Sequence, residues 1–321
     1  MRRIKKCTVF LLLLCLLLNL AGCAAAQKPL RVTLVLKTVT EVAEFWETLL
    51  SGVEKAAEEY GVELKVLTSP REIDIDKQIE LIRQVTADKP DVMILSAADY
   101  DRCAEATEEA IAAGIGVVAI DTDVNAAGRA CFVGSNSYEI GLEMGRAMAS
   151  YLPEGGKVAV IQHMLTTTTG IERTRGVLDA LNEAGNIEIL GSFCCDNSTE
   201  QAQTITTELL SADPEIRGFV CTNEVCNVGA ANALVELGMG GRVYVVGCDN
   251  SQRQIQFLEQ NIIQAIVTQR PFNMGYVAVQ QAVRVANGEQ TDDFVEVSCV
   301  LITRENMYTQ ENQKLLFPVL R

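Results

Sequence analysis

The pattern of hydrophobic and polar residues changes its period repeatedly along the chain after residue 30. Short runs rich in Val, Ile and Leu are typical of buried strands, and between them apolar residues recur at a spacing of three or four, as in amphipathic helices. The first helical pattern runs from Val42 to Tyr60 and stops at Gly61. This alternation predicts an α/β protein in which helical crossovers join parallel strands.

The predicted elements fall into two series. The first has strands at 31–36, 62–67, 91–96, 115–121 and 131–136, with helices over 42–60, 75–88 and 100–113. The second has helices from about residue 170 and over 199–211, 226–237 and 273–287, with strands at 157–162, 187–193, 218–223, 242–249, 264–269 and 297–304. About 290 ordered residues exceed one typical core, so two lobes are expected. No low-complexity linker separates the series, which favours lobes joined by strand-like crossings: 29–135 with 270–296, and 136–269 with 297–321.

The first 28 residues have the layout of an export signal. Four basic residues, an apolar run from Val9 to Leu18 and small residues around Cys23 follow one another in that order. The stretch "LAGC" resembles the lipobox of bacterial lipoproteins, which implies a signal peptide over 1–22, lipidation at Cys23 and a tether over 23–28. An ordinary signal peptide or an uncleaved anchor remains an alternative, although the apolar run is short for a membrane span. We therefore expect an extracytoplasmic lipoprotein at the cell membrane.

Charge and cysteine content narrow the possible partners. The formal net charge of -15 argues against nucleic acid, because binding to phosphates needs a basic surface. The eleven cysteines are scattered without a framework spacing, and several lie inside apolar strand patterns, so we expect reduced, buried thiols. A redox role for the adjacent Cys194 and Cys195 stays open. His163 is the only histidine and no CxxC pair occurs, so no metal or other cofactor is expected.

Polar residues follow several of the predicted strands. Because open α/β sheets bind ligands beyond the carboxyl ends of their strands, these residues are candidates for a shared crevice. They are Asp121, Asn223, Asp249 and Gln269. Asp and Asn also cap helices well, and for Asp123, Glu224 and Asn250 we favour that structural explanation.

The chain resembles the type 1 periplasmic binding proteins for sugars, of the ribose- and galactose-binding kind, whose fold also forms the ligand domain of lac-repressor-like regulators. The resemblance covers nearly all of residues 30–310. It depends on the order and spacing of individually loose stretches, among them "EFWETLLSGVEKAAEEYG", "AGIGVVAIDTD", "GIERTRGVLDAL", "FVCTNEVCNVGAANAL", "VYVVGCDN" and "AIVTQRPFNMGYVAVQ". It implies two doubly wound parallel-sheet lobes joined by a strand-crossing hinge.

The resemblance also implies ligand-binding residues. Phe45 and Trp46 match the aromatic pair that packs on a sugar ring, Asp121 the carboxylate of the first lobe and Arg173 the donor opposite it. The remaining matches are Asn223, Asp249 and Gln269, and Asn197 stands where relatives often have another aromatic residue. Departures at Ala43, Glu44, Thr122 and Cys248 leave open which sugar, or which other small polar ligand, is bound.

The functional prediction is a binding protein and not an enzyme. Two hinged lobes would close on a polyhydroxyl ligand and present it to an ABC permease, and the protein would act as a monomer. A sensor subunit for a membrane kinase or chemoreceptor is an alternative, and a D-x-D phosphatase using Asp121 and Asp123 is a weaker one. A Ser-His-Asp hydrolase is unsupported because His163 has no G-x-S-x-G partner. A DNA-binding repressor is disfavoured, since an export signal stands where its headpiece would be.

Overall fold

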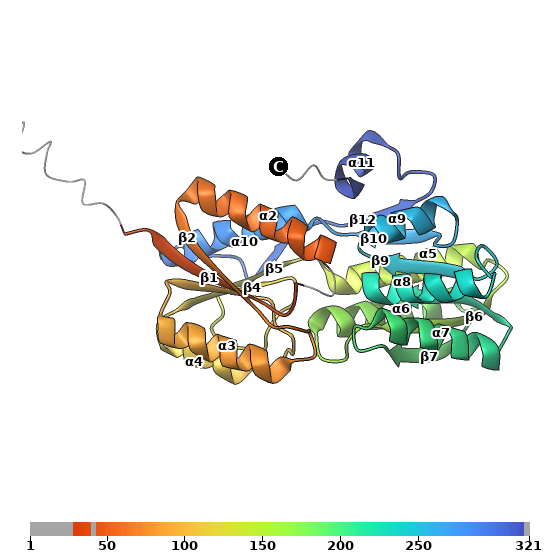
Figure 1. Cartoon of the computed structure of the whole chain (residues 1–321), viewed down its shortest axis with the longest axis horizontal. Coiled ribbons are helices and arrows are strands. Elements are labelled where there is room, and N and C mark those ends of the chain that lie inside the picture. Colours follow the sequence, from red (N-terminus) through yellow and green to blue (C-terminus); the bar gives the residue numbers. More distant parts are fainter. Residues whose placement is uncertain (1–27, 40–42, 318–321) are drawn as a thin grey trace, which may run out of the picture.

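Two α/β lobes lie end to end in the computed structural model, which describes residues 28–39 and 43–317 (Figure 1). The predicted signal peptide and the lipidation site at Cys23 lie outside the described residues. The N-terminal lobe consists of β1 (Leu30–Leu36), α2 (Ala43–Tyr60), β2 (Val62–Thr68), α3 (Ile75–Asp88), β3 (Val92–Leu95), α4 (Ala104–Ala112), β4 (Gly116–Ile120), β5 (Cys131–Gly134), α10 (Pro271–Ala286) and β11 (Phe294–Glu296).

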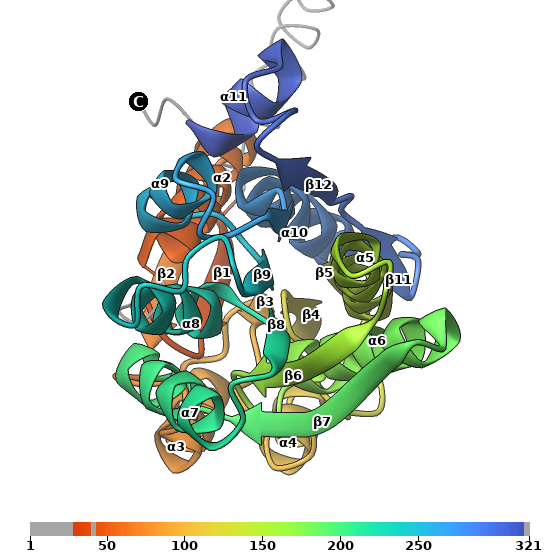
Figure 2. The ribbon, with the colours of Figure 1, turned by 90° about the vertical axis from the view of Figure 1, so that its right-hand side faces the viewer.

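The C-terminal lobe is built in the same way. It contains α5 (Ser137–Tyr151), β6 (Gly156–Gln162), α6 (Thr168–Ala184), β7 (Ile187–Cys194), α7 (Thr199–Ala212), β8 (Ile216–Cys221), α8 (Glu224–Glu236), β9 (Tyr244–Cys248), α9 (Gln252–Glu259), β10 (Ala265–Thr268), β12 (Val300–Thr303) and α11 (Gln310–Leu316). Helices cover both faces of its sheet, with α5 and α6 on one side and α7 and α8 on the other (Figure 2). None of the helices in the described part of the chain is long and apolar enough to span a membrane.

Each lobe has one six-stranded sheet. The strand orders are β11-β5-β4-β3-β1-β2 and β12-β10-β9-β8-β6-β7. All neighbouring pairs are parallel except β10 and β12, which run antiparallel. The chain passes from one lobe to the other after β5, after β10 and between β11 and β12. The predicted fold class, two doubly wound lobes with strand crossings between them, is confirmed.

The predicted strands are all present, but four further elements were not predicted. Three of them are short: α9, α11 and β11 have eight, seven and three residues. The fourth, α5, contains Gly141 and Gly145, which lower helix propensity. A Cβ atom on Gly141 would lie 2.2 Å from the backbone oxygen of Arg173, so this glycine allows α5 to pack closely on α6.

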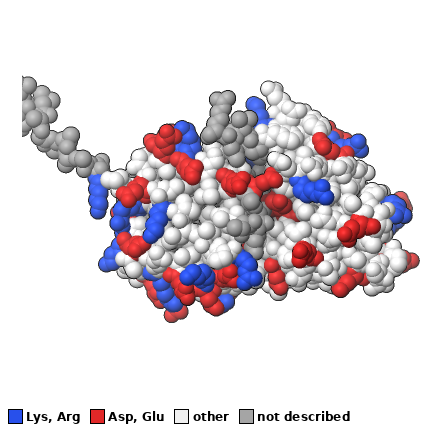
Figure 3. Space-filling view, viewed as in Figure 1, with Lys and Arg blue, Asp and Glu red and all other residues white. Residues whose placement is uncertain are grey.

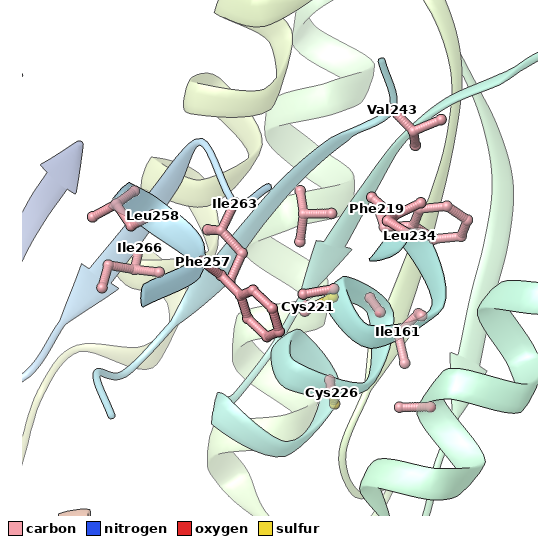
Figure 4. Close-up of a cluster of buried hydrophobic side chains, with 14 of the residues drawn as sticks. Ile161, Phe219, Cys221, Cys226, Leu234, Val243, Phe257, Leu258, Ile263 and Ile266 are labelled. Atoms are coloured by element: carbon pink, nitrogen blue, oxygen red, sulfur yellow. The ribbon is translucent and has the colours of Figure 1, made fainter. Parts of the chain in front are cut away.

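Buried apolar strands and helix faces form the cores. In the C-terminal lobe, Phe219 on β8 and Phe257 on α9 are almost completely buried, and Figure 4 shows their side chains among those of Ile263, Cys221 and Leu234. On the outside, acidic and basic residues are interspersed over the face drawn in Figure 3. The cores fix both sheets, and with them the strand ends where the chain crosses between lobes.

Candidate functional site

Two aspartates stand at matching places in the two lobes. Asp121 follows β4 and Asp249 follows β9, and both have positive φ, 62° and 70°. Asp tolerates this left-handed conformation better than most residues, but it still costs backbone energy and is found often at functional sites. Both side chains are about 95% buried. Because both follow buried parallel strands, they are predicted to share a crevice.

A small cavity between the lobes brings these residues together. Its volume is about 30 Å³, which is room for one or two water molecules and much less than a sugar needs. Seven of the eight predicted ligand-binding residues line it, and Asn197 is the exception. The lining residues are Lys37, Phe45, Trp46, Glu72, Asp121, His163, Thr169, Arg173, Asn223, Asp249 and Gln269. A larger groove of about 720 Å³ lies outside, between α2, α10 and α11, and shares only Phe45 with the cavity.

On the N-terminal side, Lys37 connects two carboxylates. Its Nζ lies 2.8 Å from Glu72 Oε1 and 3.4 Å from Asp121 Oδ2, and all three side chains are at least 94% buried. Burial alone would lower the pKa of Lys37, but the charges of Glu72 and Asp121 outweigh it and raise this pKa. Lys37 is therefore a buried ammonium group at the wall of the cavity.

On the C-terminal side, Arg173 and Asp249 form the corresponding pair. Arg173 Nη1 donates to the backbone oxygen of Thr222 at 2.9 Å and lies 3.8 Å from Asp249 Oδ2. Gln269 Nε2 donates to Asp249 Oδ1 at 2.7 Å. Burial opposes the charge of Arg173, but nearby Cys248, Asp249 and Asp121 raise its pKa overall. Its Nε is buried without a hydrogen-bond partner, so one donor is available to a ligand.

The two aromatic residues of α2 form the apolar wall. Phe45 and Trp46 meet edge to face, with ring centroids 5.0 Å apart and planes at 89°. Both are more than 90% buried and belong to the core of the N-terminal lobe, yet both line the cavity. The indole Nε1 of Trp46 is buried without a partner and is a second available donor.

His163 is a structural part of the site. Its Nδ1 lies 2.8 Å from Thr222 Oγ1, and its Nε2 lies 3.2 Å from Thr169 Oγ1. Burial, together with the charges of Lys37 and Arg173, holds the pKa of His163 well below its usual value of 6.5. The ring is therefore neutral and hydrogen-bonded to hydroxyls, and it is poorly placed to activate a nucleophile.

Asn197 binds across the two lobes although it does not line the cavity. Its Nδ2 donates to Glu72 Oε2 at 2.9 Å, and its Oδ1 accepts from Asn223 Nδ2 at 2.8 Å. Further bonds between the lobes lie at the rim: the backbone N of Tyr100 donates to the oxygen of Thr166 at 2.9 Å, and that of Asp123 to Thr168 Oγ1 at 3.0 Å. The lobes are therefore closed on one another.

Sequence reasoning missed Lys37 and Glu72. Lys37 follows β1 directly, so a charged residue after a buried strand was a usable signal. Glu72 lies between β2 and α3, where no pattern marks it. The helix-capping explanation for Asp123, Glu224 and Asn250 was also wrong. Asp123 is followed by strand β5 and not by a helix, and residues other than Glu224 and Asn250 cap α8 and α9. The caps are Asn223, which accepts from the backbone N of Cys226, and Ser251, which accepts from that of Gln254.

Comparison with known proteins gives the same fold. Residues 33–290 match the family described as "Periplasmic binding protein domain". The chain belongs to this family. It is 25% identical over 303 residues to the D-allose-binding periplasmic protein of Escherichia coli, covering 90% of this chain and 96% of the relative. It is 26% identical to the D-ribose/D-allose-binding protein of Pseudomonas aeruginosa, with 86% and 89% covered.

Solved structures of similar sequence have the same two-lobed form. A sugar transporter from Clostridium phytofermentans is 28% identical, with a TM-score of 0.79 and coverage of 85% of this chain and 98% of that one. An ABC transporter periplasmic solute binding protein from Actinobacillus succinogenes with bound D-allose is 26% identical, with a TM-score of 0.80 and coverage of 87% and 98%.

This family consists of binding proteins, so the protein is not an enzyme. The phosphatase alternative is set aside accordingly. Its second aspartate, Asp123, does not line the cavity and pairs instead with Arg129, whose Nε lies 2.7 Å from Asp123 Oδ1.

Proposed function

We propose that the protein is a lipid-anchored, extracytoplasmic solute-binding protein that captures a sugar or a similar polyhydroxyl ligand between its lobes. The proposal is carried by one observation: the cavity at the junction of the lobes has carboxylates, amides, two cationic groups and two aromatic rings around it. The relatives named for D-allose and D-ribose support the same ligand class.

The lining residues suit the chemistry of a sugar. Hydroxyl protons need acceptors, which the carboxylates of Asp121 and Asp249 supply, and ring and hydroxyl oxygens need donors. Arg173 Nε and Trp46 Nε1 are such donors without a partner in the protein. The rings of Phe45 and Trp46 offer an apolar surface to the C–H face of a sugar. These eight residues, Phe45, Trp46, Asp121, Arg173, Asn197, Asn223, Asp249 and Gln269, remain our proposed site, and Lys37 and Glu72 are added to it.

Ligand entry requires the lobes to separate. The cavity is too small for a sugar, and the rim bonds at Thr166 and Thr168 join the two lobes. A ligand that contacts both lobes favours the closed state by the difference between its closed-state and open-state affinities. The proposed hinge follows the lobe boundaries 29–135 with 270–296 and 136–269 with 297–321. Sheet membership supports them, since β11 pairs with β5 while β10 pairs with β12.

We further propose that the closed protein delivers its ligand to an ABC permease as a monomer held at the membrane by a lipid on Cys23. The import and transport names of relatives and structural neighbours support the permease as partner. The "LAGC" stretch supports the anchor. Replacing Cys23 with alanine should release the protein into the medium, and a variant that stays in the membrane fraction would contradict lipidation.

Calorimetric titration with D-allose, D-ribose and D-arabinose tests ligand capture. We expect one of these sugars to bind the wild type, and Asp249→Ala to weaken that binding about 5- to 150-fold, because a buried polar partner is lost at a cost of about 1–3 kcal/mol. Asp123→Ala is the matched control, because Asp123 lies outside the cavity. Equal loss in both variants, or no loss in Asp249→Ala, would remove Asp249 from the site. If no sugar in a full set gives a heat of binding, the proposed ligand class is refuted.

A further inference from the structure

Two buried cysteine sulfurs of the C-terminal lobe lie next to one another. Cys195 follows the last residue of β7, Cys226 lies in the first turn of α8, and their Sγ atoms are 3.5 Å apart although the residues are 31 positions apart in sequence. Both are fully buried in the core of this lobe. A disulfide needs the sulfurs at about 2.05 Å, so a further approach of about 1.5 Å would join them.

We propose that Cys195 and Cys226 form a reversible disulfide by exchange with a small-molecule disulfide such as oxidised glutathione. The inference rests on the proposed extracytoplasmic location, since disulfides form and persist outside the cytoplasm. It does not depend on which ligand the cleft binds.

The environment of Cys195 favours it as the attacking thiol. Its pKa is lowered, first by the hydrogen bond with Cys226, which outweighs burial, and then by the backbone N–H groups of Ser198 and Asn197 before α7. Burial raises the pKa of Cys226. The thiolate is the nucleophile in disulfide exchange, and a lowered pKa increases its population.

The exchange takes place in two balanced steps. The Cys195 thiolate attacks one sulfur of the small disulfide, forms a mixed disulfide and releases one small thiolate, which takes up the proton lost by Cys195. The Cys226 thiolate then attacks the Cys195 sulfur and releases the second small thiolate, which takes up the proton lost by Cys226. The two protein thiols together lose two electrons, and the small disulfide gains them and is reduced to two thiols.

Neighbouring cysteines are worse partners. Cys194 Sγ is hydrogen-bonded instead to the backbone oxygen of His163 at 3.6 Å and to Asp196 Oδ1 at 3.3 Å. Cys221 lies on β8 in the same core as Cys226, and both appear in Figure 4. Cys226 is in direct sulfur contact with Cys195, with the two Sγ atoms 3.5 Å apart. The redox pair is thus Cys195 with Cys226 and not the adjacent Cys194 with Cys195.

The bond would hold together two loops of the ligand site. Cys195 precedes Asn197 by two residues, and the backbone N of Cys226 donates to Asn223 Oδ1 at 3.0 Å. Asn197 and Asn223 are themselves hydrogen-bonded at 2.8 Å. A disulfide would fix the loop after β7 to the start of α8. It would thereby support Asn197, whose side chain reaches across to Glu72.

Thiol trapping tests the proposal. The full chain is exported by the host and solubilised in detergent. The protein is incubated in glutathione buffers of increasing oxidised fraction, both folded and during refolding from urea, because both sulfurs are buried. Remaining thiols are alkylated, and the unreduced digest is analysed by mass spectrometry. We expect a cross-linked peptide pair containing Cys195 and Cys226, lighter by two hydrogen atoms than the sum of its parts. We also expect a melting temperature roughly 5–10 °C above that of the reduced protein.

The variants make the assignment specific. Cys195→Ser should abolish the cross-linked peptide and leave Cys226 alkylated. Cys226→Ser should also abolish it and leave Cys195 as a mixed disulfide with glutathione, because the thiol that resolves this intermediate is gone. Cys103→Ser, at a buried cysteine of the other lobe, should retain the cross-link. A cross-link in either the folded or the refolding sample supports the proposal. Full alkylation of Cys195 and Cys226 in both samples at the most oxidising ratio overturns it, and so does a predominant link from Cys195 to Cys194 or Cys221.

Discussion

The buried ammonium group of Lys37 gives the sharpest test of how the site is held together. Its Nζ lies 2.8 Å from Glu72 Oε1 and 3.4 Å from Asp121 Oδ2, with side chains only 6%, 2% and 6% exposed. In Lys37→Met the apolar stem is largely kept and the charge is removed. Two carboxylates then remain buried without their shared counter-ion.

We expect Lys37→Met to lower the free energy of unfolding by about 3–5 kcal/mol, the cost typical of removing one partner of a buried ion pair. The matched control is Lys77→Met. Lys77 also lies 2.8 Å from its partner, Glu80, but these side chains are 53% and 69% exposed. Exposed pairs contribute about 0.2–1 kcal/mol. The two variants therefore separate burial from distance as the source of the energy.

Thermal melting followed by circular dichroism, with calorimetry for the enthalpy, measures both variants. The pKa of Lys37 is raised from 10.5, so its contribution is fully present below pH 10.5 and is lost only as the pH rises through the higher folded-state pKa. The effect should accordingly be constant between pH 6 and pH 9. Adding Glu72→Gln to Lys37→Met should restore part of the loss, because one uncompensated carboxylate disappears. Equal melting temperatures of Lys37→Met and Lys77→Met would refute this reasoning.

Three further perturbations test other parts of the molecule. Gly141→Ala should weaken ligand binding, measured by calorimetric titration, because its Cβ would meet the backbone oxygen of Arg173 at 2.2 Å and displace α6. Burial, with Asp249 and Glu44 nearby, raises the pKa of Glu224 from 4.5 to about 7, so the folded protein keeps this proton after the unfolded chain has released it. Its stability should therefore fall as the pH rises from about 4.5 to about 7, and Glu224→Gln should gain about 3 kcal/mol over the wild type across that window in urea titrations. Phe219→Ala should cost about 3–5 kcal/mol in the same assay, because Phe219 is fully buried.

Each of these has a contradicting outcome. Unchanged affinity in Gly141→Ala would show that α5 and α6 separate without moving Arg173. A stability difference between Glu224→Gln and wild type that stays flat from pH 4.5 to pH 7 would mean that Glu224 ionises normally. Val235→Ala, at a side chain 48% exposed on α8, is the control for Phe219→Ala and should cost much less. Equal costs in these two variants would contradict burial as the source of the loss.

Much of the fold could be predicted because its signals are local. Strands such as β3 and β9 are continuous apolar runs between polar residues, and buried parallel strands need such runs. Helix α2 has a clear apolar stripe, because one face of an amphipathic helix packs against the core. Helix α5 was missed because Gly141 contributes to close packing on α6. That benefit depends on Arg173, 32 positions further along the chain, and helix propensity does not register such a distant partner.

The residues of the candidate site also differ in whether the sequence marks them. Asp121, Asn223, Asp249 and Gln269 were marked by their places after predicted strands, and the resemblance to the family added Phe45, Trp46 and Arg173. Glu72 has no such mark. It reaches the site because Lys37 and Asn197, one from each lobe, bind it there.

The sequence by itself determined the type of each element with a clear apolar pattern, the two-lobed α/β class and the strand ends that carry polar residues, since hydrophobic periodicity and residue type act over a few positions. Only the tertiary structure decided which side chains meet across the lobes, which ionisable groups are buried together and that Cys195 faces Cys226 and not Cys194. Those facts follow from contacts between residues distant in sequence, because burial and Coulomb energy depend on neighbours in space.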